Sequence, residues 1–213
     1  MKKLLITYVI ACLPMAAFAQ KQVQKRLQNQ LIVVKSGDTI HLDKGFFELE
    51  GTLWLDDKQD VVIMGKGKDA TILSFKNQKS GAEGIKVTNC RNIIIEGLTV
   101  LDTKGDAIKV QQTEGITFRD VKTGWSGKPK KTNGGYGFYP VNCQKVLIEH
   151  CEAVGASDAG IYVGQSKEIV VRNCKAWHNV AGIEIENSLH ADVYDNEAFN
   201  NTGGILLCLT CPI

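Results

Sequence analysis

The sequence predicts an all-β fold: a right-handed, single-stranded parallel β-helix with three strands per coil and an N-terminal capping helix. The first observation behind this prediction is a repeat, in which an apolar residue preceded by Gly or Ala recurs at steps of 23, 30, 23, 22 and 22 residues. The residues that mark it are Ile85, Ile108, Phe138, Ile161, Ile183 and Ile205. The second observation is that apolar and polar residues alternate within each repeat. The third is that each repeat contains a residue of a type that tolerates the left-handed backbone conformation. Repeats of this length are typical of solenoids, in which each unit buries its apolar face against its neighbours.

The first segment, residues 1–19, has the features of a secretory signal peptide. Basic residues at the start precede an apolar run from Leu4 to Phe18, and the small-x-small pattern that follows predicts cleavage after Ala19. The run is too short to predict a membrane span. We therefore expect a secreted or periplasmic protein. The alternative is a lipid anchor, since residues 9–12 resemble a lipobox, although the residues after Cys12 stay apolar.

The second segment, residues 20–36, is predicted to hold a capping helix from Gln22 to Lys35. Its apolar residues have helical spacing: Val23, Leu27, Leu31 and Val34. The end of a solenoid exposes an unpaired strand edge and open core, so a helix at this place would cover both.

The third segment, residues 37–207, contains the coils, each with three short alternating runs. Because successive strand residues point to opposite faces, the first run gives two inward apolar columns and one outward column. That outward column contains Trp54, Lys86, Lys109, Tyr139, Tyr162 and Glu184. The outward column of the second run alternates in charge, which predicts cross-strand ion pairs between exposed residues. It contains Glu96, Arg119, Glu149, Arg172 and Tyr194.

Two further columns indicate how the chain bends. Residues that tolerate the left-handed region follow the second run, and we interpret His150 as one of these turn residues rather than a catalyst. They are Gly97, Asp120, His150, Asn173 and Asp195. A column of amides follows the first run and is predicted to hydrogen-bond along the stack. It contains Asn89, Gln112, Asn142, Gln165 and Asn187.

Four cysteines of the coils are predicted to be free thiols. Cys151 and Cys174 fall on adjacent rungs of an inward column, where parallel strands seldom offer the geometry of a disulfide. Cys90 and Cys143 are two rungs apart, which is too far to bridge.

Three segments resemble a family of exported bacterial parallel β-helix repeat proteins: residues 37–40, 65–73 and 156–166. The wider fold of that family is similar to that of pectin lyases and mannuronan epimerases. The resemblance implies a pectin-lyase-like β-helix over the whole mature chain, and it implies no particular reaction. Where this chain ends in residues 208–213, the family continues Gly-Gly-Ile-Leu with Val-Phe-Asp-Leu-Pro. We therefore expect residues 208–213 to be a non-native, frameshifted tail on a C-terminally truncated chain.

Composition and one irregular coil direct attention to a possible ligand. The chain has 25 Lys and Arg against 23 Asp and Glu, and removal of the signal peptide makes it formally neutral, which argues against a nucleic-acid partner. The coil of 30 residues carries an insertion at residues 123–136 that is expected to overhang the outward column of the first run.

Aromatic and cationic side chains along a flat sheet suit an extended acidic sugar chain. We therefore predict an exported protein that binds, and if catalytic modifies, an acidic polysaccharide. The candidate binding residues are Trp54, Lys86, Lys109, Trp125, Lys128, Tyr139, Tyr162 and Glu184. The alternative is a non-catalytic structural or interaction scaffold of the cell envelope. The sequence predicts no oligomeric state.

Whether the chain is an enzyme stays open at this point. A lyase or epimerase needs a base beside a neutralised carboxylate, for which Lys109, Tyr162 and Glu184 are the candidates. The paired Asp residues of pectin hydrolases and the Asp-Pro-His-Asp pattern of mannuronan epimerases are both missing from the sequence. Asp106 and Asp158 precede first-run strands and are candidate calcium ligands, while the alternative is that they cap the backbone of turns. No other cofactor is expected.

Overall fold

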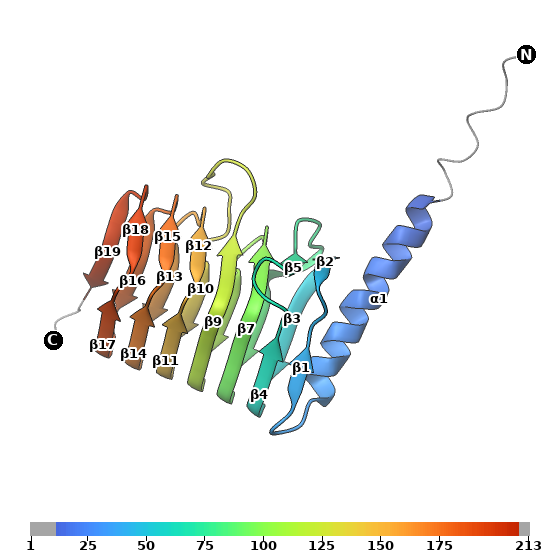
Figure 1. The fold of residues 1–213 in the computed structure, drawn as a ribbon, viewed down its shortest axis with the longest axis horizontal. Helices are drawn as coiled ribbons and strands as arrows, with labels where there is room; N and C mark the ends of the chain where they lie inside the picture. The colour runs from blue at the N-terminus through green and yellow to red at the C-terminus, as the bar shows by residue number, and fades with distance from the viewer. Residues whose placement is uncertain (1–11, 209–213) are drawn as a thin grey trace, which may run out of the picture.

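The protein forms a solenoid of parallel strands in a computed structural model that describes residues 12–208 (Figure 1). Part of the predicted signal peptide, residues 1–11, and most of the predicted tail, residues 209–213, lie outside the described residues. One sheet has seven strands, and it is formed by the first run of each coil. Its strands are β3 (Gly51–Asp56), β6 (Ser80–Thr88), β8 (Ile108–Gln111), β10 (Phe138–Val141), β13 (Ala159–Gly164), β16 (Ala181–Glu186) and β19 (Gly203–Cys208).

The other sheet has twelve strands, arranged in two wings. The first wing, formed by the second run of each coil, contains β1 (Thr39–His41), β4 (Gln59–Met64), β7 (Arg91–Leu101), β9 (Glu114–Gly124), β11 (Gln144–Glu149), β14 (Lys167–Arg172) and β17 (Leu189–Tyr194). The second wing contains β2 (Gly45–Glu48), β5 (Thr71–Ser74), β12 (Glu152–Val154), β15 (Lys175–Trp177) and β18 (Glu197–Phe199), and β7 and β9 run through both wings. Neighbouring strands pair in parallel and in the predicted register, for example Ile93 with Ile116 and Val121 with Leu98.

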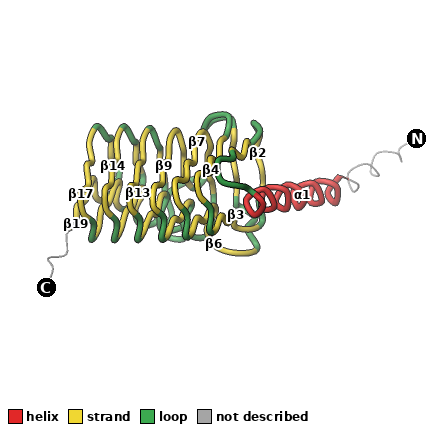
Figure 2. The backbone as a smooth tube through the Cα atoms, turned by 90° about the horizontal axis from the view of Figure 1, so that it is seen from below, coloured by secondary structure: helices red, strands yellow, loops and turns green. Residues whose placement is uncertain are grey.

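Helix α1 (Cys12–Val33) meets the N-terminal end of the solenoid and extends beyond it (Figure 2). Leu27 and Leu31 are buried, as the helical spacing predicted. The side-chain amide of Gln28 accepts a hydrogen bond from the backbone N–H of Trp54 and donates one to its carbonyl, both at 2.9 Å. In this way α1 satisfies polar groups of the edge strand β3 that would otherwise be open.

The bounds of this helix differ from the prediction. It begins within the predicted signal segment and ends at Val33, two residues before Lys35. The chain turns there because the backbone N–H of Lys35 donates to the carboxylate of Asp38 and Gly37 has a φ of 86°. No helix in residues 12–208 has the length and apolar character needed to cross a membrane.

The inward columns form one core along the solenoid. Phe118 and Phe138, from the first wing and the seven-stranded sheet, are fully buried and meet edge to face with ring centroids 5.2 Å apart. The cysteines of the coils, Cys90, Cys143, Cys151 and Cys174, are buried free thiols, as predicted.

The bends after the first run and after the second run both have left-handed backbone. The predicted turn residues after the second run have φ values of 50° to 65°, and His150 is one of them at 55°. The amide column has φ values of 46° to 54°, so it forms a second left-handed bend, a role the sequence analysis did not assign.

The ladder of hydrogen bonds at this second bend is made by the column after the amides. The backbone N–H of Cys143 donates to the hydroxyl of Ser166 at 3.0 Å, and that of Ser166 donates to the hydroxyl of Ser188 at 3.1 Å. Each hydroxyl in turn donates to a carbonyl two residues earlier in its own coil. These short side chains point inward and leave the amides on the outer side of the bend.

The predicted ladder of ion pairs is confirmed. Arg119 bridges Glu96 and Glu149, and Arg172 contacts Glu149 and the hydroxyl of Tyr194. One member differs from the expectation of exposed pairs, because Glu149 is only 5% exposed. Burial alone would raise the pKa of Glu149, but hydrogen bonds and charges from Arg119 and Arg172 outweigh it and lower the pKa.

Candidate functional site

The outward column of the seven-stranded sheet forms a continuous row, which we call the first-sheet column. Strand register pairs Trp54 with Lys86, Lys86 with Lys109, Lys109 with Tyr139, and Tyr162 with Glu184. Tyr139 and Tyr162 also fall on neighbouring rungs, because Phe138 pairs with Ile161. The predicted column therefore exists as one row on one sheet.

At the N-terminal end of this row, Trp54 is an exposed aromatic residue held in a fixed position. It is 48% exposed, and its indole N–H donates to the hydroxyl of Thr88 at 2.8 Å. The Nζ atom of Lys86 lies 5.5 Å from the centroid of the Trp54 ring. Beside them lies a groove of about 450 Å³ whose lining includes Gln28 of α1 and Glu83. An aromatic face, a cation and polar groups thus surround one groove.

Lys109, the next cation of the row, is already engaged within the protein. Its Nζ atom lies 3.5 Å from a carboxylate oxygen of Asp106 and 4.8 Å from the centroid of the Tyr139 ring. Burial raises the pKa of Asp106, although the charge of Lys109 opposes the shift. Each lysine therefore lies over an aromatic ring of a neighbouring strand: Lys86 over Trp54 of the preceding coil, and Lys109 over Tyr139 of the following coil.

In the middle of the row, the tyrosines form a packed cluster. Tyr136, at the end of the insertion, stacks on Tyr139 with ring centroids 4.4 Å apart and contacts the ring of Tyr162 at 4.8 Å. Tyr162 is consequently only 6% exposed. Its hydroxyl donates to a carboxylate oxygen of Glu186 at 2.5 Å. Burial and this hydrogen bond raise the pKa of Tyr162 well above its ordinary value, so the phenol keeps its proton at neutral pH.

At the C-terminal end, the row becomes acidic. Burial raises the pKa of Glu184, and the negative charges of Asp158 and Glu186 raise it further. The row therefore changes sign along its length, from Lys86 and Lys109 to Glu184. The sequence column already ended in Glu184, but the two carboxylates that strengthen this acidic end, Asp158 and Glu186, belong to other columns.

The two candidate calcium ligands both have partners within the protein. Asp106 contacts Lys109, and Asp158 accepts a hydrogen bond from the hydroxyl of Tyr136. The backbone carbonyl of Asp158 also accepts hydrogen bonds from the N–H groups of Val180 and Ala181 in the next coil. Within residues 12–208, no group of three or more His, Cys, Asp or Glu side chains is arranged to hold a metal ion.

The insertion contributes differently from what the sequence suggested. Trp125 was expected on the binding face, but it is 8% exposed, and its indole N–H donates to the carbonyl of Thr103 at 2.8 Å. Trp125 therefore belongs to the core. Lys128 lies exposed in the insertion. The residue that does reach the first-sheet column is Tyr136, whose only hint in the sequence was an aromatic ring next to a first-run strand.

Comparison with known proteins agrees with this architecture. A family model described as "Right handed beta helix region" matches residues 60–212. Among solved structures, one titled "Geobacillus virus E2 - ORF18" is similar, with a TM-score of 0.64 and 12% identity over 81% of this chain and 37% of that one. A rhamnogalacturonan lyase gives a TM-score of 0.53 and 12% identity over 85% of this chain and 56% of that one.

At such identities these similarities show the fold alone, and the chain spans well under two thirds of either structure. No curated protein matches it. The family model, in contrast, covers more than half of the chain. The chain therefore belongs to the family of right-handed β-helix proteins.

Proposed function

We propose that this protein binds an extended acidic polysaccharide along the first-sheet column. The observation that carries the proposal is the register, which sets six aromatic and charged side chains in one row. Neighbouring strands are about 4.8 Å apart, so the row is roughly 24 Å long. A linear row of this length suits a chain-like ligand better than a compact one.

The N-terminal half of the row supplies the contacts that an acidic sugar chain needs. The exposed ring of Trp54 offers a face on which a sugar ring can stack. Lys86 makes no ion pair with the side chains of residues 22–208, although its charge acts on the carboxylate of Asp56, so its ammonium group can meet a uronate. Lys109 would bind a carboxylate of the ligand by weakening its ion pair with Asp106.

The acidic end of the row limits how such a ligand lies. Asp158, Glu184 and Glu186 would repel a uronate placed over the tyrosine cluster. We therefore expect the charged sugars to lie between Trp54 and Lys109, with an uncharged sugar or the end of the ligand over the tyrosines. The likeness in fold to a rhamnogalacturonan lyase agrees with a polysaccharide ligand.

Binding is the function proposed here, and the geometry gives less support to modification of the ligand. Tyr162 is buried and its hydroxyl donates a hydrogen bond to Glu186, and Lys109 is paired with Asp106. Neither is arranged as a free base, and the third candidate, Glu184, lies near the negative charges of Asp158 and Glu186, which would repel a uronate. The second candidate function is therefore a non-catalytic scaffold of the cell envelope. Either role fits the secreted or periplasmic location expected from the N-terminal segment.

A glycan-binding measurement tests the proposal. We expect the protein to bind oligogalacturonate or oligomannuronate in titration calorimetry, with an affinity that falls as salt rises. Trp54→Ala and Lys86→Ala should each weaken binding at least tenfold. The matched control is Lys175→Ala, which removes an exposed lysine paired with Glu197 on another face. Failure to bind any acidic oligosaccharide, or equal losses in all three variants, would contradict the proposal.

A further inference from the structure

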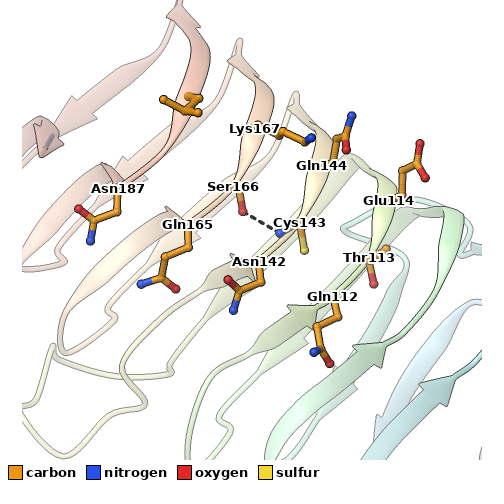
Figure 3. Close-up of a pocket in the computed structure, with 11 residues that line it drawn as sticks. Gln112, Thr113, Glu114, Asn142, Cys143, Gln144, Gln165, Ser166, Lys167 and Asn187 are labelled. Atoms are coloured by element: carbon orange, nitrogen blue, oxygen red, sulfur yellow. Dashed lines mark hydrogen bonds between the residues drawn. The ribbon is translucent and has the colours of Figure 1, made fainter. Parts of the chain in front are cut away.

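A second hollow lies on a different side of the solenoid, at the bend between the seven-stranded sheet and the first wing. It has a volume of about 540 Å³ and crosses four successive coils (Figure 3). Its lining includes Gln144 and four members of the amide column, one from each coil: Gln112, Asn142, Gln165 and Asn187. Because neighbouring strands are about 4.8 Å apart, these amides form a row with a spacing of one rung.

The amides point away from the core, while the hydroxyls behind them point inward. Figure 3 shows the amides in one row, with Glu114, Gln144 and Lys167 in a second row on the other side of the hollow. Between the rows, Ser166 accepts the backbone N–H of Cys143 and belongs to the internal ladder. The structural hydrogen bonds of the bend are thus made by the hydroxyl and thiol column rather than by the amides.

Three of the amides have no structural task that the described residues reveal. The side chains of Gln112, Asn142 and Gln165 are exposed and make no hydrogen bond to another group in residues 12–208. The amide of Asn89, one coil earlier, shows the contrast, since it donates to the carboxylate of Asp56 at 2.9 Å. Each unpartnered amide offers one acceptor and two donors to the hollow.

The side chains of the two glutamines are longer than the backbone of this bend requires. Gln112 and Gln165 have φ values of 52° and 46°, in the left-handed region that favours Gly, Asn and Asp. An asparagine would form the same bend with less strain, as Asn142 does in the coil between them. The bend itself therefore does not explain the longer side chain, whereas contact with a ligand in the hollow would.

The charges around the hollow indicate what kind of ligand fits. Glu114 and Lys167 carry opposite signs at the rim, and Glu114 is also paired with Lys145 at 2.7 Å. The hollow therefore has no net preference for an anion or a cation. Repeated groups that both donate and accept hydrogen bonds match the paired hydroxyls of uncharged sugars.

We propose that this amide row is a second carbohydrate site, one that binds a neutral, extended glycan along the solenoid axis. It lies on another face from the first-sheet column and stands independently of the function proposed for that column. Together the two sites would allow one chain to contact a neutral and an acidic polysaccharide at the same time.

The test compares neutral and acidic probes on variants that keep the bend. Glycine adopts positive φ readily, so Gln112→Gly, Asn142→Gly and Gln165→Gly combined should remove the amides without strain. Titration calorimetry would use the hexasaccharides of β-1,4-glucan, β-1,4-xylan and β-1,4-mannan, with hexagalacturonate as the acidic probe. We expect the unaltered protein to bind at least one neutral probe, and the triple variant to bind it at least tenfold more weakly while binding hexagalacturonate unchanged.

Two control variants are needed. One shows whether removal of any exposed amide at a bend affects binding, and the other shows whether neutral glycans bind at the first-sheet column instead. Asn173→Gly removes an exposed amide at the other bend, where φ is 53°, and should leave all binding unchanged. Trp54→Ala should weaken binding of the acidic probe only. Gln165→Asn, tested in case the triple variant does not fold, should raise the melting temperature and weaken neutral binding. The proposal is overturned if no neutral probe binds, if Gln165→Asn and the triple variant bind as the unaltered protein does, or if Trp54→Ala abolishes neutral binding.

Discussion

Replacing Glu149 with Gln should cost far more stability than the same change at an ordinary surface ion pair. The carboxylate of Glu149 is 5% exposed and accepts hydrogen bonds from Nε of Arg119 and from Nε and Nη2 of Arg172, at 2.7, 3.0 and 2.6 Å. Breaking a buried ion pair costs about 3–5 kcal/mol. The side chains of Arg119 and Arg172 are 47% and 39% exposed, so water can hydrate them once the carboxylate is gone. We therefore expect the free energy of unfolding to fall by about 2 kcal/mol, the value typical of hydrogen bonds to a charged group, rather than by the full cost of breaking a buried pair.

The matched control is Glu114→Gln. Glu114 makes an ion pair with Lys145 at the same distance of 2.7 Å as Arg119 makes with Glu149, but both partners are about half exposed. An exposed pair of this kind contributes little to stability, so Glu114→Gln should destabilise the protein far less than Glu149→Gln. Urea unfolding at pH 7 measures both losses, and an unchanged dependence on urea concentration would show that the unfolded state is the same. Equal losses in the two variants would refute the reasoning, because Glu149 is buried and bonded to two arginines, whereas Glu114 is exposed and bonded to a single lysine.

The effect of Glu149 should also depend on pH. Its pKa in the folded protein is lowered from the ordinary value of 4.5, because the two arginines outweigh burial. A group with a depressed pKa contributes its stability above the unfolded value and loses it as the pH falls through the folded value. The difference between the unaltered protein and Glu149→Gln should therefore be constant near pH 7 and shrink below about pH 4.5. A difference that does not change between pH 7 and pH 3 would contradict this assignment.

Three further predictions follow from the packing. Gly65→Ala should destabilise the protein by about 3 kcal/mol or more, because an added Cβ would clash with the backbone carbonyl oxygen of Gly97. The control is Gly204→Ala, whose added Cβ has no atom within 4 Å and should change stability by less than about 0.5 kcal/mol. Phe118→Ala should cost about 3–5 kcal/mol in urea unfolding, because the ring is fully buried against Phe138; a loss under about 1 kcal/mol would contradict this packing. The thiols of Cys90, Cys143, Cys151 and Cys174 should react with a thiol reagent only after unfolding, because all four are buried. Burial also raises the pKa of Cys143 to about 11, which keeps it in the unreactive thiol form. Mass spectrometry measures the labelling, and rapid labelling of the folded protein would contradict a closed core.

The coil geometry could be predicted from the sequence because each strand position recurs in every coil. Ile85, Ile108 and Phe138 fall in one inward column because side chains alternate between the two faces of a strand. Once one residue of a coil is assigned to the inner face, the facing of the corresponding residues in all other coils follows. The left-handed residue after the second run was predictable in the same way, since His150 shares its column with Asp and Asn.

What could not be predicted involves groups outside the repeat. Tyr136 covers Tyr162 because the insertion folds back, and a unique loop has no second copy to compare. Trp125 is buried for the same reason, by a contact with Thr103 from the preceding coil. From the sequence, the ladder of hydrogen bonds is expected in the amide column, because stacked amides are known to bond along a stack of strands. The structure places the ladder one residue later, in a column of Cys, Thr and Ser that is also visible in the sequence.

The most direct test of the proposed function is a crystal structure of the protein soaked with trigalacturonate. We expect one sugar ring against Trp54, in the groove beside Gln28, and uronate carboxylates within hydrogen-bond reach of the Nζ atoms of Lys86 and Lys109. The tyrosine cluster and Glu184 should carry no uronate. Ligand density on another face of the solenoid, or uronates placed over Glu184 and Glu186, would contradict the account.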